Sequence, residues 1–279
     1  MSKNVVKTAV NAIQKFYPIK LADKTWDNTG LLVDASHDEQ SSSAADEKIR
    51  VLLTIDLTQD VANEAIQNKS NLIMAYHPFI FKGLKSIGQS DPQQKSLVKL
   101  IRNGISVYCP HTAVDSAKGG VNDFLADGIS KGIKEDSREV VEKDKEEEGC
   151  GMGRIIQLSK PTPLSKLVDN VKVSLGLSHL QVALARGENK EHLISSIAIC
   201  AGSGGGVFRG LKADLFYTGE LSHHEALYFN ETGSSIIVCN HSNTERAFLN
   251  TIQEQLIEEL PEGSEVKISE KDKDPFQTW

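Results

Sequence analysis

The sequence predicts an α/β protein built as two halves, because strand-like apolar runs alternate with amphipathic helical segments along the chain. In the first half, strands are expected at Val51–Leu57, Asn71–Tyr76 and Ile105–Cys109, with helical segments between them. The second half repeats this pattern, most clearly in a strand–helix–strand unit from Ala213 to Asn240. Strands connected through helices usually lie parallel, so we expect largely parallel sheets.

Several helix boundaries follow from residues that favour helix ends. Thr58 would cap a helix that continues to about Asn68. Pro92 would open a helix that stops at Gly104, since proline fits the first helical turn and glycine the residue after the last. The apolar periodicity predicts one long amphipathic helix from Asn243 to Leu260.

The first twenty residues fit two interpretations. They show a helical pattern with Val6, Ile13 and Phe16 on one face, and they contain lysines but no acidic residue. A mitochondrial leader can have this composition, but it is usually rich in arginine, which this segment lacks. We therefore favour a structural helix and a cytoplasmic protein, with a mitochondrial location as the alternative.

A charged run suggests where the two halves meet. Residues 135–148 are mostly charged and end in three consecutive glutamates, a composition typical of solvated segments. We predict an N-terminal half at 1–132, an acidic linker or exposed excursion at 133–151, and a C-terminal half at 152–279. Residues 37–47, rich in Ser, Asp and Glu, are also expected to be poorly ordered.

The charge balance and the cysteines bear on the class of protein. The net charge of −7 argues against direct nucleic-acid binding, which depends mainly on Lys and Arg. No apolar run approaches the roughly 18 residues of a membrane span. The four cysteines form no C-x-x-C pair, and three lie in apolar, strand-like stretches. We therefore expect free thiols in a reducing compartment.

Four polar clusters each follow the C-terminal end of an apolar strand. In open α/β sheets, ligands bind beyond the carboxyl ends of the strands, so the clusters would converge if their strands share one sheet. Imidazole and carboxylate groups together bind first-row divalent ions, and the convergence therefore predicts a metal or catalytic site. The clusters are Ala75–Phe79, Pro110–Asp115, Thr218–Glu220 with His223 and His224, and Asn240–Glu245.

Taken one at a time, these residues also have structural interpretations. Glu245 stands three residues after Ser242, the spacing of a helix capping box, and four residues after His241, the spacing of two ligands on one helix face. Asp115 fits a turn, and His223 and His224 fit an exposed helix start. Elsewhere, the glycine-rich segment 201–206 fits a tight turn better than a phosphate cradle. In segment 26–32, Asp27 and Asn28 could orient other groups, but a structural turn is the safer interpretation.

As a set, the motifs resemble those of the NGG-one-interacting-factor-three (Nif-three-like) family over nearly the whole chain. The Tyr-His-Pro form and the Asp274-Pro275-Phe276 ending resemble its eukaryotic branch. The resemblance implies the Nif-three-like fold, in which two α/β halves surround a shared metal cleft, and bacterial relatives form hexamers built from dimers. The motifs are Trp26-Asp27-Asn28-Thr29-Gly30-Leu31, Tyr76-His77-Pro78, His111-Thr112-x-x-Asp115, Thr218-Gly219-Glu220 and His241-x-x-x-Glu245.

The resemblance also implies a set of ligands for one or two divalent ions, with zinc, iron and manganese all compatible. Many bacterial members have a His-His pair where this chain has Tyr76-His77, and a neutral phenol is a poor ligand. We therefore expect at least one ion, with the second bound weakly or absent. Tyr76 and His111 would support the ligands or face the substrate. The implied metal ligands are His77, Asp115, His241 and Glu245.

The favoured function is a metal-dependent hydrolase that acts on a phosphate-bearing or heterocyclic metabolite, with Glu220, His223 and His224 as its catalytic proton-transfer groups. Many family members carry the label GTP cyclohydrolase one, type two, homologue. The alternatives are a non-enzymatic partner of a transcription coactivator with a structural metal, and a metal carrier or sensor. A homo-oligomer, either a dimer or a hexamer of dimers, is expected in each case.

Overall fold

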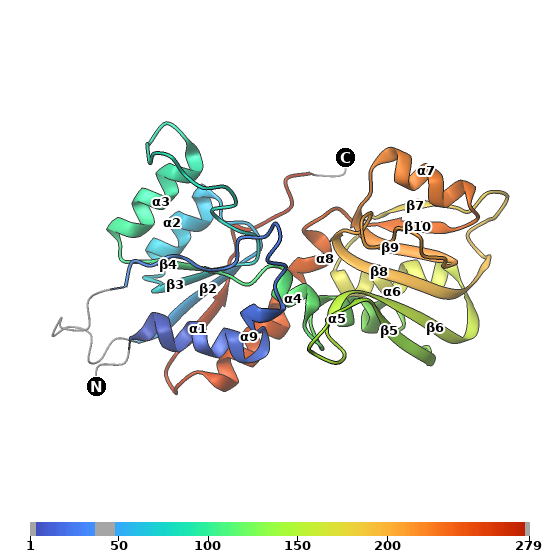
Figure 1. Ribbon diagram of the computed structural model, residues 1–279, viewed down its shortest axis with the longest axis horizontal. Helices are drawn as coiled ribbons and strands as arrows, with labels where there is room; N and C mark the ends of the chain where they lie inside the picture. The colour runs from blue at the N-terminus through green and yellow to red at the C-terminus, as the bar shows by residue number, and fades with distance from the viewer. Residues whose placement is uncertain (1–3, 37–47, 277–279) are drawn as a thin grey trace. The chain divides into compact units, whose positions relative to one another are not determined.

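The computed structural model describes residues 4–36 and 48–276 and shows the predicted α/β architecture (Figure 1). The chain divides into two compact units. Unit 1 comprises Met1–Val114 and Leu249–Lys273, and unit 2 comprises Asp115–Phe248 and Asp274–Trp279. The division therefore falls near residues 114 and 248, not at 133–151. The polar segment 37–47 lies outside the described residues.

Within the described residues, unit 1 is built on a five-stranded sheet in the order β1-β4-β3-β2-β11. Strands β4, β3, β2 and β11 run parallel, as predicted, and β1 pairs antiparallel with β4 at one edge. β3 and β4 are fully buried, which explains their continuous apolar sequences. The strands are β1 (Gly30–Val33), β2 (Arg50–Thr54), β3 (Leu72–Ala75), β4 (Ser106–Cys109) and β11 (Glu265–Ile268).

Two helices of unit 1 begin where the sequence predicts. The Thr58 side chain accepts a hydrogen bond from the Val61 amide, and Asp91 caps the helix that Pro92 opens. Both helices pack against the apolar core on β2, β3 and β4. The helical segments are α1 (Val5–Phe16), a 3₁₀ turn (Ile19–Leu21), α2 (Gln59–Gln67), α3 (Pro92–Arg102) and α9 (Leu249–Glu259), while α4 (Thr112–Ser116) crosses the boundary between the units.

Unit 2 holds a six-stranded mixed sheet in the order β5-β6-β8-β9-β10-β7 across its described residues. β8, β9 and β10 run parallel, whereas the outer strands pair antiparallel. Helices α5 and α6 pack on β6, and α7 packs on β10. The elements are β5 (Glu135–Lys143), β6 (Gly151–Pro163), β7 (Gln181–Ala183), β8 (Leu193–Ser203), β9 (Leu215–Glu220), β10 (Ser235–Val238), α5 (Val121–Ile129), α6 (Leu164–Leu175), α7 (His223–Glu231) and α8 (Asn243–Arg246).

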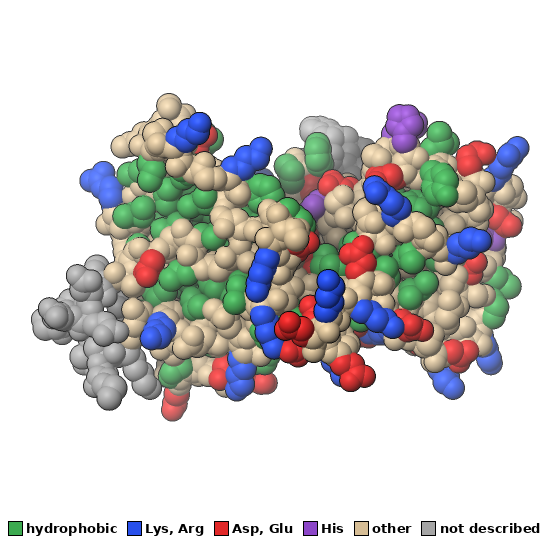
Figure 2. Space-filling view, viewed as in Figure 1, with side chains coloured by type: hydrophobic (Ala, Val, Ile, Leu, Met, Phe, Trp, Pro, Cys, Tyr) green, Lys and Arg blue, Asp and Glu red, His purple; other side chains and the backbone are tan. Residues whose placement is uncertain are grey.

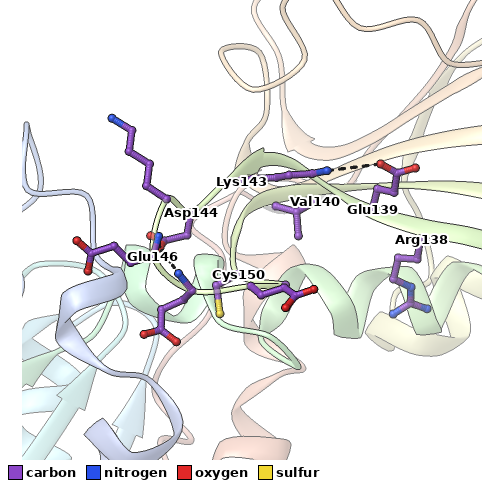
Figure 3. A pocket seen from close by; sticks show the side chains of 11 residues that line it. Arg138, Glu139, Val140, Lys143, Asp144, Glu146 and Cys150 are labelled. Atoms are coloured by element: carbon purple, nitrogen blue, oxygen red, sulfur yellow. Dashed lines mark hydrogen bonds and ion pairs between the residues drawn. The ribbon is translucent and has the colours of Figure 1, made fainter.

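The segment 133–151, for which the sequence suggested an acidic linker or an exposed excursion, is not a linker. It contains β5, which pairs with β6, and the hairpin turn between them. The Asp144 carboxylate fixes this turn by accepting hydrogen bonds from the amides of Glu146 and Glu147, each at 2.8 Å. The hairpin lines a depression of about 520 Å³ (Figure 3). Charged side chains are typical of edge strands, where they prevent pairing with other chains. They give this segment the amino-acid composition of a solvated linker.

The predicted helix from Asn243 to Leu260 is two helices, α8 and α9, separated at Ala247 and Phe248. The Phe248 amide donates to the Glu245 carbonyl at 3.0 Å, a tighter i to i+3 bond than an α-helix makes. The apolar spacing continues through this turn, which explains why periodicity alone did not reveal it. Among the described residues, no helix has the length and apolar character that crossing a bilayer requires.

Candidate metal centre

Unit 1 brings two of the predicted imidazoles together. His77 follows β3 and His111 follows β4, and these strands are parallel neighbours, so their carboxyl ends lie side by side. The two ring centroids are 5.5 Å apart. His111 has a backbone φ of +34°, which is uncommon for a residue with a side chain and is often found at functional sites.

A carboxylate orients each of these imidazoles. Nδ1 of His77 lies 2.9 Å from Asp56 Oδ1, and Nδ1 of His111 lies 2.7 Å from Asp27 Oδ1. Metal-binding histidines usually make such a bond through the nitrogen that is not a ligand, because it fixes the tautomer and the ring orientation. Nε2 is therefore the nitrogen through which either ring would meet an ion or a substrate.

Asp27 has a larger role than the structural turn that the sequence suggested. Its side chain is fully buried, and its second oxygen accepts a hydrogen bond from the Thr112 hydroxyl at 2.6 Å. Burial alone would raise the pKa of Asp27, but the hydrogen bonds from His111 and Thr112 outweigh it and hold the pKa below its ordinary value. Asp27 is thus a carboxylate that positions His111.

Asp56 was missed by the sequence analysis, although the rule that ligands bind beyond the carboxyl ends of the strands could have found it. It lies two residues after β2, the parallel neighbour of β3, and so belongs to the same row of strand ends as His77. Tyr76 is fully buried and lies edge-on to both imidazoles, with centroid distances of 5.6 Å to His77 and 6.2 Å to His111. Its phenol ring packs the site, and its effect on a second ion stays a prediction.

Unit 2 uses the same neighbour rule to position His241. Glu220 ends β9, and His241 follows the parallel strand β10, so Glu220 Oε1 reaches Nδ1 of His241 at 2.9 Å. The other ring nitrogen lies 3.5 Å from Oε1 of Glu245, whose side chain is only 4% exposed. The donor atoms of His241 and Glu245 are thus close enough to hold one ion.

The structure removes the capping-box alternative for Glu245. Helix α8 begins after Ser242, but the Ser242 side chain makes no capping hydrogen bond. Its hydroxyl instead donates to Asp274 Oδ2 at 3.2 Å. The carboxylate of Glu245 points toward His241, as a ligand would, so the capping-box interpretation was wrong.

Gly202, near the end of β8, makes room for these donors. A Cβ atom at this position would lie 2.9 Å from Nε2 of His241 and 3.0 Å from Oε1 of Glu245, and the backbone φ of +62° also favours glycine. The donors therefore surround a space that any side chain at residue 202 would fill. An imidazole nitrogen and a carboxylate oxygen around such a space fit a divalent ion.

Asp115 belongs to the same part of unit 2. Its carbonyl accepts a hydrogen bond from the buried Asn122 side chain, whose oxygen accepts one from the Ala201 amide, each at 2.9 Å. Burial raises the pKa of the Cys200 thiol, and the charges of Asp115, Glu142 and Glu245 raise it further. Through Asn122, Asp115 is joined to Ala201 near the end of β8, and the next residue of that strand, Gly202, lies beside the Glu245 carboxylate.

His223 and His224 lie at the exposed start of α7, and their ring centroids are 5.4 Å apart. Figure 2 shows exposed histidine side chains, in purple, over α7. Helix α7 begins with a capping box between Ser222 and Glu225. His224 lines a separate cavity of about 320 Å³ on α7. The catalytic role of the two histidines stays a prediction, whereas Glu220 has a direct contact with His241.

The four strand-end clusters belong to two sheets, and the condition that they share one sheet does not hold. His77 and His111 lie in unit 1, whereas Asp115, His241 and Glu245 lie in unit 2. Each unit gathers its own donors by placing neighbouring strand ends side by side. That His77 shares an ion with the donors of unit 2 stays a prediction.

Comparison with known proteins identifies the family. Residues 5–275 match the family described as Duf34/NIF3 (NGG1p interacting factor 3). The NGG1-interacting factor 3 of Saccharomyces cerevisiae is 48% identical over 275 residues, which cover 96% of this chain and 94% of that protein. The NIF3 homolog of Schizosaccharomyces pombe is 46% identical over 287 residues and is matched along 100% of both chains.

A solved structure shows the same fold. The Bacillus cereus protein described as related to NIF3 superimposes with a TM-score of 0.82 at 21% identity, over 100% of each chain. The family match, the two fungal relatives and this fold agree with the motifs read from the sequence. The chain belongs to the Duf34/NIF3 (NGG1p interacting factor 3) family.

Proposed function

We propose that this protein binds one or two divalent metal ions and uses them to hydrolyse a phosphate-bearing or heterocyclic metabolite. The observation that supports this proposal most strongly is the repeated pairing of an imidazole with a carboxylate, in Asp56–His77, Asp27–His111 and Glu220–His241. Such pairs are typical of histidines that bind metals or transfer protons, because they fix which nitrogen carries the proton.

The donor set favours a borderline metal. His77, Asp115, His241 and Glu245 would hold the ion, and their mixture of nitrogen and oxygen suits zinc, iron or manganese. When bound, such an ion would supply Lewis-acid activation of a substrate oxygen and of water. Buried Glu245 and Asp115 would supply the negative charge that offsets the charge of the ion.

The remaining groups would orient the reactants. Glu220 and Asp56 hold their imidazoles by Nδ1, and Asp27 does the same for His111. His111 would face the substrate through Nε2, where a fixed tautomer allows it to donate or accept one defined hydrogen bond. Proton transfer by Glu220, His223 or His224 remains part of the proposal.

Elemental analysis of the purified full-length chain, followed by a screen of phosphoesters and nucleotides, tests this function. We expect bound divalent metal and a metal-dependent hydrolytic signal, and we expect His241→Ala and Glu245→Gln to lose both. His179→Ala is a matched control, because His179 is exposed and contacts Ser178. If the metal content survives in the His241 and Glu245 variants, or if the metal-loaded protein hydrolyses nothing, the proposal fails.

A protein-interaction function is the second candidate. The Saccharomyces cerevisiae relative that is 48% identical is named for its interaction with NGG1, so we propose that this chain binds a comparable transcription-coactivator partner. The metal would then stabilise the fold or a homo-oligomer. Chelation distinguishes the two functions, because a lower melting temperature or oligomer mass without any catalytic signal would favour the structural role. A cytoplasmic location remains part of either proposal.

A further inference from the structure

Unit 1 exposes two aromatic rings beside its imidazoles. Trp26 is 53% exposed and Phe81 is 48% exposed. Their ring centroids are 6.2 Å apart, with the planes tilted by 49°. Large aromatic rings gain much free energy when they are covered, so two adjacent exposed rings call for a functional explanation. Trp26 and Phe81 are called the aromatic pair below.

Polar contacts hold the loops that carry the aromatic pair. The Asp23 carboxylate accepts hydrogen bonds from the amide and the hydroxyl of Thr25, the residue before Trp26, at 2.8 and 2.6 Å. The Asn28 side chain donates to the carbonyl of Ile80, which ties the Trp26 loop to the Phe81 loop. Because the rings are already positioned, a ligand would bind them with little loss of conformational freedom.

The aromatic pair is continuous with the polar cluster of unit 1. The Trp26 ring meets the His111 ring edge to face at a centroid distance of 5.7 Å, and His111 in turn contacts His77 at 5.5 Å. Since Nδ1 of His111 makes a hydrogen bond with Asp27, Nε2 is the atom that would make a hydrogen bond with a ligand on the aromatic pair. An aromatic face beside one directional polar group is the arrangement that recognises planar heterocycles.

We propose that Trp26 and Phe81 form a stacking site for a planar nitrogen heterocycle, such as a purine, whose edge is bonded by His111. This inference rests on the proposed function in one respect: the ring is taken to be part of the molecule on which the metal centre acts. The pair exposes on the order of 200 Å², well below the roughly 800 Å² that each partner contributes to a standard protein interface. A small ring fits this area better than a protein does.

Fluorescence of the metal-free protein provides a direct test. The chain has two tryptophans, Trp26 and Trp279, so Trp279→Phe leaves Trp26 as the one indole emitter. Titration of this variant with adenosine should change the Trp26 emission in a saturable way. Ribose, which lacks the aromatic ring, should leave the emission unchanged.

Substitution of the pair then measures its contribution by equilibrium dialysis with adenosine. Trp26→Ala and Phe81→Ala should each weaken binding by about 5- to 150-fold, the range for losing one stacking contact. Trp26→Phe should retain most of the affinity because it keeps an aromatic face. Ile101→Ala is the matched control, since Ile101 is an apolar side chain that is 47% exposed on α3.

Three outcomes would overturn the stacking site. The first is that neither purine nor pyrimidine nucleosides bind. The second is that Trp26→Ala binds adenosine like the wild type. The third is that Trp26→Ala changes the oligomer mass in light scattering and leaves nucleoside binding unaffected. The metal content of the wild type separates the two proposals. If the wild type holds metal but binds no nucleoside, the stacking site alone fails, whereas if it binds adenosine but holds no metal, the proposed function alone fails.

Discussion

The two units orient their imidazoles by the same device but surround them with different groups. In unit 1, His77 and His111 lie among aromatic rings and are mostly covered. In unit 2, the side chain of His241 is 38% exposed, and its neighbours are carboxylates. Unit 1 thus supplies nitrogen donors in an aromatic environment, and unit 2 supplies mainly oxygen donors.

This difference shows two ways of making room for a ligand. Unit 1 packs its imidazoles edge to face with aromatic rings and orients each by a carboxylate. Unit 2 leaves out a side chain altogether at Gly202, where the donors of His241 and Glu245 approach the main chain. The geometry of unit 2 should therefore be the more sensitive of the two to one added methyl group.

The largest effect is expected from Gly202→Ala. The new methyl would occupy the space between the donors, and the φ of +62° would add strain of about 1–2 kcal/mol. We expect the proposed ion at His241 and Glu245 to be lost, as measured by elemental analysis. Gly176→Ala is the matched control, because Gly176 has a φ of +67° with nothing within 4 Å of the added Cβ.

Gly176→Ala should lose a similar amount of unfolding free energy and keep its metal. Equal metal loss in both variants would show that backbone strain, and not the occupied space, explains the result. The proposal that unit 2 makes room for an ion by omitting a side chain at Gly202 would then be wrong.

A smaller effect is expected when the orienting carboxylates are removed one at a time. Glu220→Ala frees His241 in unit 2, and Asp56→Ala frees His77 in unit 1, so each should lower metal affinity by about 10- to 100-fold. Isothermal titration with zinc measures both, with Glu254→Ala, at an exposed position of α9, as the control. An unchanged affinity in Asp56→Ala alone would mean that unit 2 binds the ion without His77.

The smallest expected effect is on the pH dependence of stability, and it should appear in both units. Burial raises the pKa of Asp123, but hydrogen bonds and charge from Arg154 outweigh it, so its pKa, like that of Asp27, lies below the ordinary 3.8. A carboxylate of this kind stabilises the fold above its unfolded pKa. That contribution is lost as the pH falls from about 5 through the lower folded pKa.

Asp27→Asn and Asp123→Asn should therefore each be less stable near neutral pH and lose less stability on acidification. Urea unfolding across the acid range measures this slope, and each depressed unit of pKa corresponds to about 1.4 kcal/mol. If the slope is unchanged in a variant, the corresponding partner, His111 for Asp27 or Arg154 for Asp123, does not lower the pKa of that carboxylate.

Much of the fold could be predicted because local signals agree with the tertiary structure. Thr58 and Pro92 mark helix starts by chemistry that acts within one turn, and the structure confirms both. The expectation that residues after neighbouring strand ends lie close together also holds within each sheet. It places His77 beside His111 and Glu220 beside His241. It succeeds wherever the two strands are parallel neighbours.

The rest depended on contacts between distant residues. Strand β5 was hidden by its charged composition, and nothing local to β11 indicates that it pairs with β2. The sequence likewise could not show that the strand ends divide between two sheets. The contact between Asp27 and His111 joins residues 84 positions apart, so spacing carried no sign of it.

The pairing of β11 with β2 has a consequence for synthesis on the ribosome. Unit 2 is inserted between β4 and α9, so its main segment, Asp115–Phe248, is translated before the strand that completes the sheet of unit 1. Until Glu265–Ile268 emerges, the apolar strand Arg50–Thr54 has an open edge, which nascent chains can use to aggregate. The main segment of unit 2 can fold as it emerges, whereas the sheet of unit 1 is completed only after Glu265–Ile268 has emerged, and chaperones would protect it best until then.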